Sequence, residues 1–217
     1  MMSDRPTVFV VDDDQSVRKG LGRLLQTRGY RVWSFISAEE FLEGKLDDVR
    51  IACLILDINL PGLNGFELQN RLLRRGLFIP IIFITGHGDI PMAVRAMKSG
   101  AASFLAKPFG EHELLAEVEK ALAACEREIE MHSEMAAIQQ RYGTLTARET
   151  EVLSLVTSGK LNKQTAAELG IVENTVKVHR RRVMRKMHAE SVAELVLMAQ
   201  KLNLIPEHQP QAQRPSL

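Results

Sequence analysis

Two stretches decide the fold of the first part of this chain: VFVVDDD at residues 8–14 and IACLILD at residues 51–57. In each stretch a short apolar run leads directly into acidic residues. An apolar run without polar alternation is typical of a strand that is covered on both faces, as in a parallel sheet. A third apolar run occupies residues 81–84, and weaker runs occupy residues 31–35 and 102–105. The sequence therefore predicts a set of short parallel strands.

Amphipathic stretches separate these runs. Apolar residues recur at helical spacing over residues 15–27, 38–46, 65–74, 90–99 and 111–124. Strands that alternate with helices predict a parallel sheet with helices on both faces. For residues 1–125 we expect an α/β flavodoxin-like, doubly wound domain with a five-stranded parallel sheet. Its site should lie at the carboxyl ends of the strands.

The helical pattern continues beyond this domain. Residues 111–140 predict one long helix, because no glycine or proline interrupts them and their apolar residues keep a 3-4-3-4 spacing at Leu115, Val118, Leu122, Cys125 and Ile129. We expect residues 126–142 to form a helical linker that continues the last helix of the domain. The apolar spacing leaves open whether this linker pairs with a second copy. Residues 143–205 predict an all-α four-helix domain, and residues 206–217 a disordered tail.

Composition limits the class of protein. The 217 residues, 45 % hydrophobic and 25 % charged, suit two globular domains of modest size. No apolar run approaches the ~20 residues of a membrane span. Because the first residues also lack a signal-peptide pattern, we expect a cytoplasmic protein without a membrane partner. Cys53 and Cys125 are expected to be reduced packing residues rather than disulfide partners or metal ligands.

The net charge of +1 hides an asymmetry between the two parts of the chain. Residues 144–217 hold 11 Lys and Arg against 7 Asp and Glu, a balance of +4, so residues 1–143 carry −3. A basic second part favours a phosphate-bearing partner for that part.

Polar side chains follow the predicted strands at their carboxyl ends. Asp12 and Asp13 follow the first strand, Asp57 the third, and Thr85 and Lys107 the last two. These ends meet at one edge of a parallel sheet, so we expect the side chains to converge. Carboxylates packed together need a cation, and their hard oxygen ligands suit Mg²⁺. A metal-bound carboxylate beside a lysine and a hydroxyl forms a phosphoryl-acceptor site, in which the carboxylate attacks phosphorus.

These residues belong to longer motifs. VDDD at residues 11–14, LDINLPG at 56–62, ITG at 84–86 and AKPF at 106–109 stand in this order. Together they resemble the defining motifs of receiver domains. The resemblance implies that Asp57 accepts phosphate and that Mg²⁺ is held by Asp12, Asp13, Asp57 and the main-chain carbonyl of Asn59. It also implies that Thr85 and Lys107 contact the phosphoryl group, that Phe104 is the switch aromatic and that the bond before Pro108 is cis. His87 is either a rim residue that tunes dephosphorylation or a solvated loop histidine.

Residues 162–187 predict a helix, a turn and a second helix. Gly170 supplies the turn. The second helix begins after Val172, a residue that cannot cap it, and its buried side is formed by Val176, Val183 and Met187. The opposite side carries basic residues and no acid, as in a helix that enters the major groove of DNA. We expect Lys177, Val178 and Arg181 to face bases. The other expected DNA contacts are Asn162, Lys163, Thr175, His179, Arg182, Arg185 and Lys186.

A second resemblance covers this part of the chain. LTARE at residues 145–149, NK at 162–163 and TVKVHR at 175–180 resemble the LuxR/NarL-type DNA-binding domain. With GHGDIPMAV at residues 86–94, the chain resembles the FixJ subgroup of two-component transcriptional regulators. The resemblance implies a sensor histidine kinase as phosphate donor, a homodimer on phosphorylation, and promoter DNA and RNA polymerase as partners. It implies no enzymatic activity beyond phosphorylation and dephosphorylation at Asp57.

Two other classes of function stay open at this point. An aspartyl-phosphate hydrolase would place a second Asp two residues after Asp57 as general acid, but Asn59 stands there. A DNA-binding protein could use the first domain only for dimerisation, although it would then have no use for the acidic residues at the strand ends. Phosphate uptake that depends on Mg²⁺ would distinguish the second class from a phosphorylation switch.

Overall fold

The computed structural model describes residues 5–44, 49, 51–86 and 88–205. The chain divides into two compact units, Met1–Ile129 and Glu130–Leu217, and the division falls within the long helix α5 (Glu111–Gly143). His87, the end of the stretch predicted to be helical at residues 38–46, and the tail at residues 206–217 lie outside the described residues. None of the described helices is long and apolar enough to cross a bilayer.

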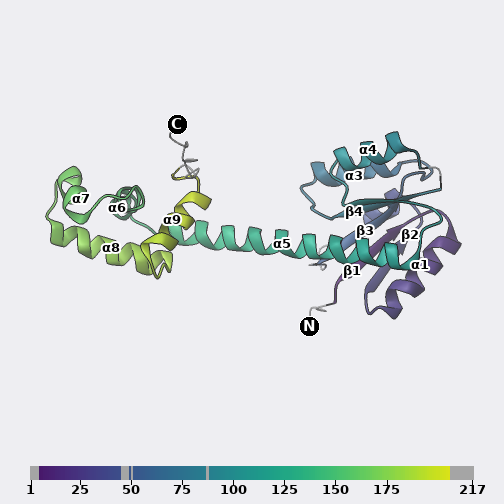
Figure 1. Cartoon of the computed structure of the whole chain (residues 1–217), viewed down its shortest axis with the longest axis horizontal. Helices are drawn as coiled ribbons and strands as arrows, with labels where there is room; N and C mark the ends of the chain where they lie inside the picture. Colours follow the sequence, from purple (N-terminus) through teal and green to yellow (C-terminus); the bar gives the residue numbers. More distant parts are fainter. Residues whose placement is uncertain (1–4, 45–48, 50, 87, 206–217) are drawn as a thin grey trace, which may run out of the picture. The chain divides into compact units, whose positions relative to one another are not determined.

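The first unit contains a five-stranded sheet, as predicted (Figure 1). Its strands run parallel in the order β2-β1-β3-β4-β5, which is the flavodoxin-like order. Their bounds are β1 (Thr7–Val11), β2 (Arg31–Phe35), β3 (Ala52–Asp57), β4 (Ile81–Thr85) and β5 (Ser103–Ala106). Val11 pairs with Leu56 and Asp57 with Ile84, so the polar residues that follow these strands meet at one edge.

Helices cover both faces of the sheet. The helices of this unit before α5 are α1 (Gln15–Thr27), α2 (Ala38–Glu43), α3 (Gly65–Arg74) and α4 (Ile90–Lys98). Alternate strand residues serve the two faces: Phe9 and Leu54 pack with α2, α3 and α4, whereas Val10 and Ile55 pack with α1 and the start of α5. Burial of each such side chain stabilises the fold by about 1.5–3 kcal/mol. Figure 1 shows the two helical layers.

Helix α5 ends at Gly143, three residues beyond the predicted end, because no helix breaker precedes that glycine. Leu114, Val118 and Leu122 belong to the core of the first unit. In the last turns, Ile138 is buried and Tyr142 packs against the core of the second unit.

The second unit is all-helical, as predicted. Its helices are the end of α5, α6 (Ala147–Thr157), α7 (Asn162–Leu169), α8 (Glu173–Met187) and α9 (Val192–Lys201). Gly170 ends α7 in the left-handed conformation at φ 65°, and Val172 precedes α8 without a capping hydrogen bond. The capping box at Thr146 forms, whereas at Ser191 only the hydroxyl caps and the Glu194 carboxylate accepts from the N–H of Glu190.

Candidate functional site

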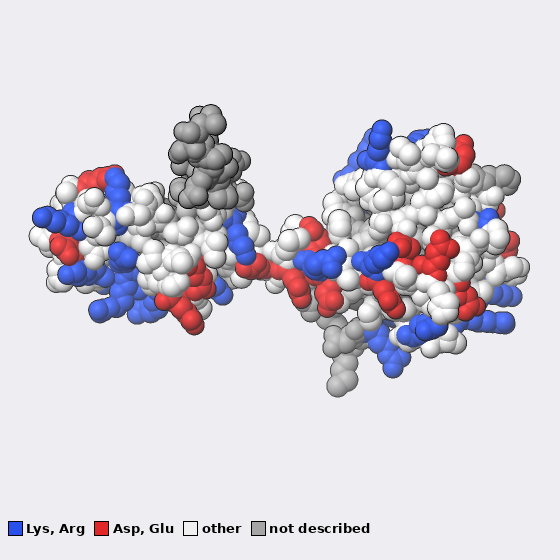
Figure 2. All heavy atoms as spheres, viewed as in Figure 1, with Lys and Arg blue, Asp and Glu red and all other residues white. Residues whose placement is uncertain are grey.

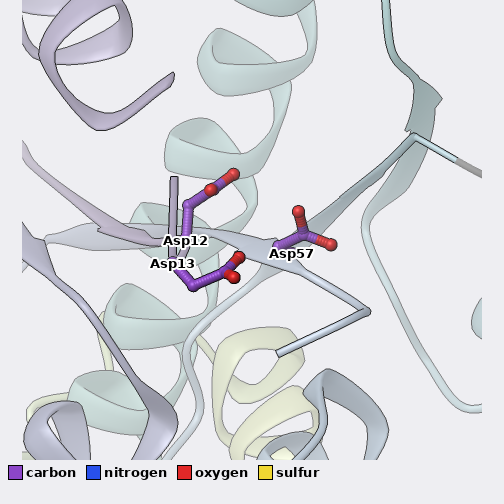
Figure 3. Close-up of side chains that lie close together, drawn as sticks. All are labelled: Asp12, Asp13 and Asp57. Carbon is purple, nitrogen blue, oxygen red and sulfur yellow. The ribbon is translucent and has the colours of Figure 1, made fainter. Parts of the chain in front are cut away.

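Three carboxylates gather at the carboxyl edge of the sheet. Asp12 and Asp13 follow β1, Asp57 ends β3, and one oxygen from each lies within 4.8 Å of the others (Figure 3). Asp12 and Asp57 are buried, at 0 % and 6 % exposed, whereas Asp13 is open to solvent. The convergence expected from the sequence is therefore present.

The Lys107 ammonium lies between two of these carboxylates. Its Nζ is 2.7 Å from Asp12 Oδ2 and 2.6 Å from Asp57 Oδ2. Burial alone would lower the pKa of Lys107, but the hydrogen bonds and charges of the two carboxylates outweigh it and raise that pKa. Burial, with a smaller effect from the charge of Asp57, raises the pKa of Asp12 despite the lysine. The peptide bond from Lys107 to Pro108 is cis.

Backbone and hydroxyl groups complete the surroundings of Asp57. Its Oδ1 accepts the N–H of Asn59 at 2.9 Å, and the Asn59 amide nitrogen donates to Thr85 Oγ1 at 3.1 Å. Thr85 is fully buried. The Phe104 ring is half-buried and packs close to Gly88, where an added Cβ would lie 3.1 Å from the ring. Asn59 and Lys107 thus donate hydrogen bonds to Asp57, Thr85 accepts from Asn59, and Phe104 and Thr85 both lie close to Gly88.

Sequence reasoning missed two residues that hold this edge in place. Arg18 on α1 donates to the Asp12 carbonyl oxygen at 2.6 Å. Gly65 begins α3 so close to β3 that an added Cβ would lie 2.7 Å from the Asp57 carbonyl oxygen. Gly65 directly follows Asn64, which caps α3, so a glycine at the start of a helix was the available signal.

The donor set suits a hard divalent cation. Three carboxylates face one ammonium, so the pocket carries an excess of negative charge, and the candidate ligand atoms are all oxygens. Mg²⁺ favours such a set, with one or two carboxylates and water completing its octahedron. The residues present therefore fit the metal that the sequence suggested.

Helix α8 presents a basic surface in the second unit. Lys177, Arg181, Arg182 and Arg185 are exposed, and Val178 is 42 % exposed among them. Figure 2 shows Lys and Arg side chains gathered over this helix. Val176, Val183 and Met187 are buried on the opposite side, as expected. The residues expected to face bases therefore share one accessible surface.

Other expected DNA-binding residues have internal contacts. Lys186 Nζ lies 2.6 Å from Glu149 Oε2 and 2.9 Å from the Thr144 carbonyl oxygen. The hydrogen bond from Lys186, followed by those at Thr146, lowers the pKa of the Glu149 carboxyl to about 2. Lys186 therefore has a structural partner that the sequence did not reveal.

Asn162, Lys163, Thr175 and His179 differ in accessibility. Lys163 is exposed, Asn162 and Thr175 are half-buried, and the Asn162 side-chain oxygen Oδ1 accepts from the Arg180 guanidinium at 2.8 Å. His179 is half-buried, and its Nδ1 is buried without a hydrogen-bond partner among the described residues. Lys163 is the most open of the four.

Two family models match the chain. Residues 8–119 match the response regulator receiver domain, and residues 143–199 match the bacterial regulatory proteins of the luxR family. The first matched segment contains the acidic cluster, and the second contains α6, α7 and α8.

Known proteins resemble almost the whole chain. Nodulation protein W of Bradyrhizobium diazoefficiens is 47 % identical over 97 % of this chain and 92 % of its own length. FixJ, a transcriptional regulatory protein of Rhizobium meliloti, is 43 % identical over 89 % of this chain and 94 % of its own length. The solved structure of the response regulator StyR is 48 % identical, covers 91 % of this chain and 99 % of that chain, and superposes with a TM-score of 0.81.

The receiver domain implies a kinase as partner, and the luxR-type domain implies binding to DNA. Two further relatives are named as a response regulator and as a transcriptional regulatory protein. The chain therefore belongs to the response regulators that join a receiver domain to a LuxR-type helix-turn-helix domain, the family of two-component transcriptional regulators that includes FixJ.

Proposed function

We propose that this response regulator is switched by phosphorylation of Asp57 by a sensor histidine kinase, and that the phosphorylated form dimerises and binds promoter DNA. One observation carries the proposal: the Asp57 carboxylate is held at the end of β3 by Lys107 and the Asn59 N–H, with Asp12 and Asp13 beside it. This arrangement leaves a carboxylate oriented for attack in an oxygen-lined pocket.

The chain's own residues supply most of the phosphoryl transfer. An Asp57 carboxylate oxygen attacks phosphorus, the bond from phosphorus to the kinase histidine breaks, and that histidine nitrogen keeps the electron pair. The Lys107 ammonium offsets charge on the phosphoryl oxygens, and the Thr85 hydroxyl donates to one of them. Mg²⁺, held by Asp12, Asp13, Asp57 and the Asn59 carbonyl, would neutralise the remaining charge. Positioning is the main contribution of the fold.

Two surfaces support the output steps. On α4, Ile90 is 81 %, Val94 46 % and Met97 51 % exposed, an apolar surface suited to pairing with a second copy. In the second unit, the exposed Lys and Arg side chains of α8 suit the major groove of DNA, with Lys177, Val178 and Arg181 facing the edges of the nucleobases. Two recognition helices in a dimer would match a two-fold DNA site, where RNA polymerase is the expected further partner.

The phosphoacceptor assignment is tested with acetyl phosphate and Mg²⁺. Wild-type chain should gain a phosphate adduct, measured by intact mass, and should gain none when a chelator is added before the reaction. The phosphorylated chain should also bind DNA more tightly and form a species of higher mass. Asp57→Asn should show none of these changes. Asp14→Asn is the matched control, because Asp14 caps α1 beside the pocket, lies outside the carboxylate cluster, and Asn caps equally well. Phosphate uptake by Asp57→Asn would overturn the assignment.

A further inference from the structure

The basic residues of α8 fall into two groups. Lys177, Arg181, Arg182 and Arg185 are exposed, whereas Arg180 is half-buried and directed at α7. One Arg180 guanidinium nitrogen donates to Asn162 Oδ1 at 2.8 Å. Arg180 therefore contacts the first residue of the preceding helix rather than lying free on the basic surface.

This hydrogen bond fixes which way the Asn162 amide faces. A guanidinium group has only donors, so it selects the carbonyl oxygen of the amide and leaves the NH₂ group on the other branch. Among the described residues, no hydrogen bond uses Asn162 Nδ2, and this atom is not one of the buried side-chain atoms without a partner. The amide therefore presents two free donors to solvent at the start of α7.

In a helix-turn-helix the first helix crosses the DNA backbone while the second occupies the groove. Asn162 begins that first helix, and the exposed Lys163 follows it. We propose that Arg180 is a positioning residue for DNA binding: it orients the Asn162 amide so that its NH₂ group donates to a backbone phosphate. This inference rests on the proposed function, because it requires α8 to occupy the groove.

Two simpler roles make different predictions. If Arg180 contacted phosphate itself, its removal would reduce the slope of log affinity against log salt by about 0.9. If the hydrogen bond only joined α7 to α8, any group that preserved it would preserve binding. The Asp side chain is such a group, since it has the size of Asn and accepts from Arg180 more strongly.

The test uses full-length chain with acetyl phosphate and Mg²⁺, and a 30-base-pair duplex selected by the wild-type chain from random sequence. Asn162→Asp keeps the acceptor for Arg180 but turns the outward donor into an anion, so affinity should fall about tenfold or more. Gln140→Glu is the matched control, because it adds the same charge to an exposed position at the end of α5. It should change affinity less than about twofold.

Arg180→Met and Asn162→Ala test the coupling between the two residues. Each should weaken binding by a similar factor, the double variant should be no weaker than either, and the salt slope should match wild type in all three. Wild-type affinity for Asn162→Asp, or a smaller salt slope for Arg180→Met, would overturn the inference. Arg181→Ala is measured alongside: if it and the Asn162 variants all bind as wild type, the proposed function fails as well.

Discussion

The pair formed by Lys186 and Glu149 gives a prediction that separates a structural cation from a DNA-binding one. Glu149 is 3 % exposed, and Lys186 donates to its carboxylate at 2.6 Å and to the Thr144 carbonyl at 2.9 Å. The pKa of Glu149 falls from its ordinary 4.5 to about 2, with the Lys186 hydrogen bond as the largest cause. A shift of this size corresponds to about 3 kcal/mol of stability at neutral pH.

Lys186→Met should therefore destabilise the second unit by about 2 kcal/mol at pH 7, because the hydrogen bonds from Thr146 remain. A carboxyl whose pKa is lowered by folding stabilises the fold above its unfolded pKa and loses that effect as pH falls through the folded pKa. The difference between wild type and variant should thus be constant above about pH 5.5 and narrow below pH 4.5, by about a third at pH 3.

Residue-resolved hydrogen exchange at the core amides of Val156 and Val183 measures this difference in the full-length chain. Lys201→Met is the control, because its ion pair with Glu134 joins side chains that are 43 % and 55 % exposed and should contribute less than about 0.5 kcal/mol. A pH-independent difference, or one no larger than that of Lys201→Met, would refute the structural role. So would a Lys186→Met variant whose DNA-binding salt slope falls by about 0.9.

Three further predictions concern single positions. Gly65→Ala should destabilise the first unit by about 2–4 kcal/mol in urea unfolding, because the added Cβ would lie 2.7 Å from the Asp57 carbonyl oxygen. Gly20→Ala is the contrast, since its Cβ meets nothing within 4 Å, and it should stabilise the unit by about 0.5–1 kcal/mol. Lys107→Met should leave the carboxylates of the pocket in mutual repulsion, so 10 mM Mg²⁺ should raise its melting temperature more than that of wild type; an equal shift would contradict this. Val172→Ser should supply the missing cap of α8 and stabilise the second unit by about 1 kcal/mol in thermal unfolding, and no gain would show that the helix start is satisfied otherwise.

The sequence predicted the fold well where one periodicity dominated. The apolar runs of β1 and β3 are buried on both faces, so they could not be confused with surface segments. The bounds of α1 were predicted to the residue, because Asp14 marks its start, and the helix, turn and helix of residues 162–187 form α7, Gly170 and α8 as expected. The convergence of Asp12, Asp13 and Asp57 followed from the positions of the strand ends alone.

Partner choice between distant side chains could not be predicted in the same way. The sequence placed Lys186 among the expected contacts to the DNA backbone, but it contains no information about where α6 brings Glu149. Arg180 follows Val176 by four residues, so its position beside the buried side of the helix was readable, but its contact with Asn162 depends on the packing of α7. Arg18 was missed for the same reason, since it acts through a backbone oxygen that no local pattern marks, whereas the glycine at position 65, at the start of a helix, was a local signal that went unused.

The lysine–carboxylate sites at Lys186 and Lys107 differ in charge balance, and this difference argues for their roles. Lys186 faces a single carboxylate, so the site is neutral and gains nothing from a further ion. Lys107 faces Asp12 and Asp57 with Asp13 close by, so the site keeps an excess of negative charge that only added cations can offset. A site that is balanced without its ligand holds its conformation, whereas one left unbalanced changes its interactions when a metal and a phosphoryl group arrive. The unbalanced site is therefore the one suited to a switch.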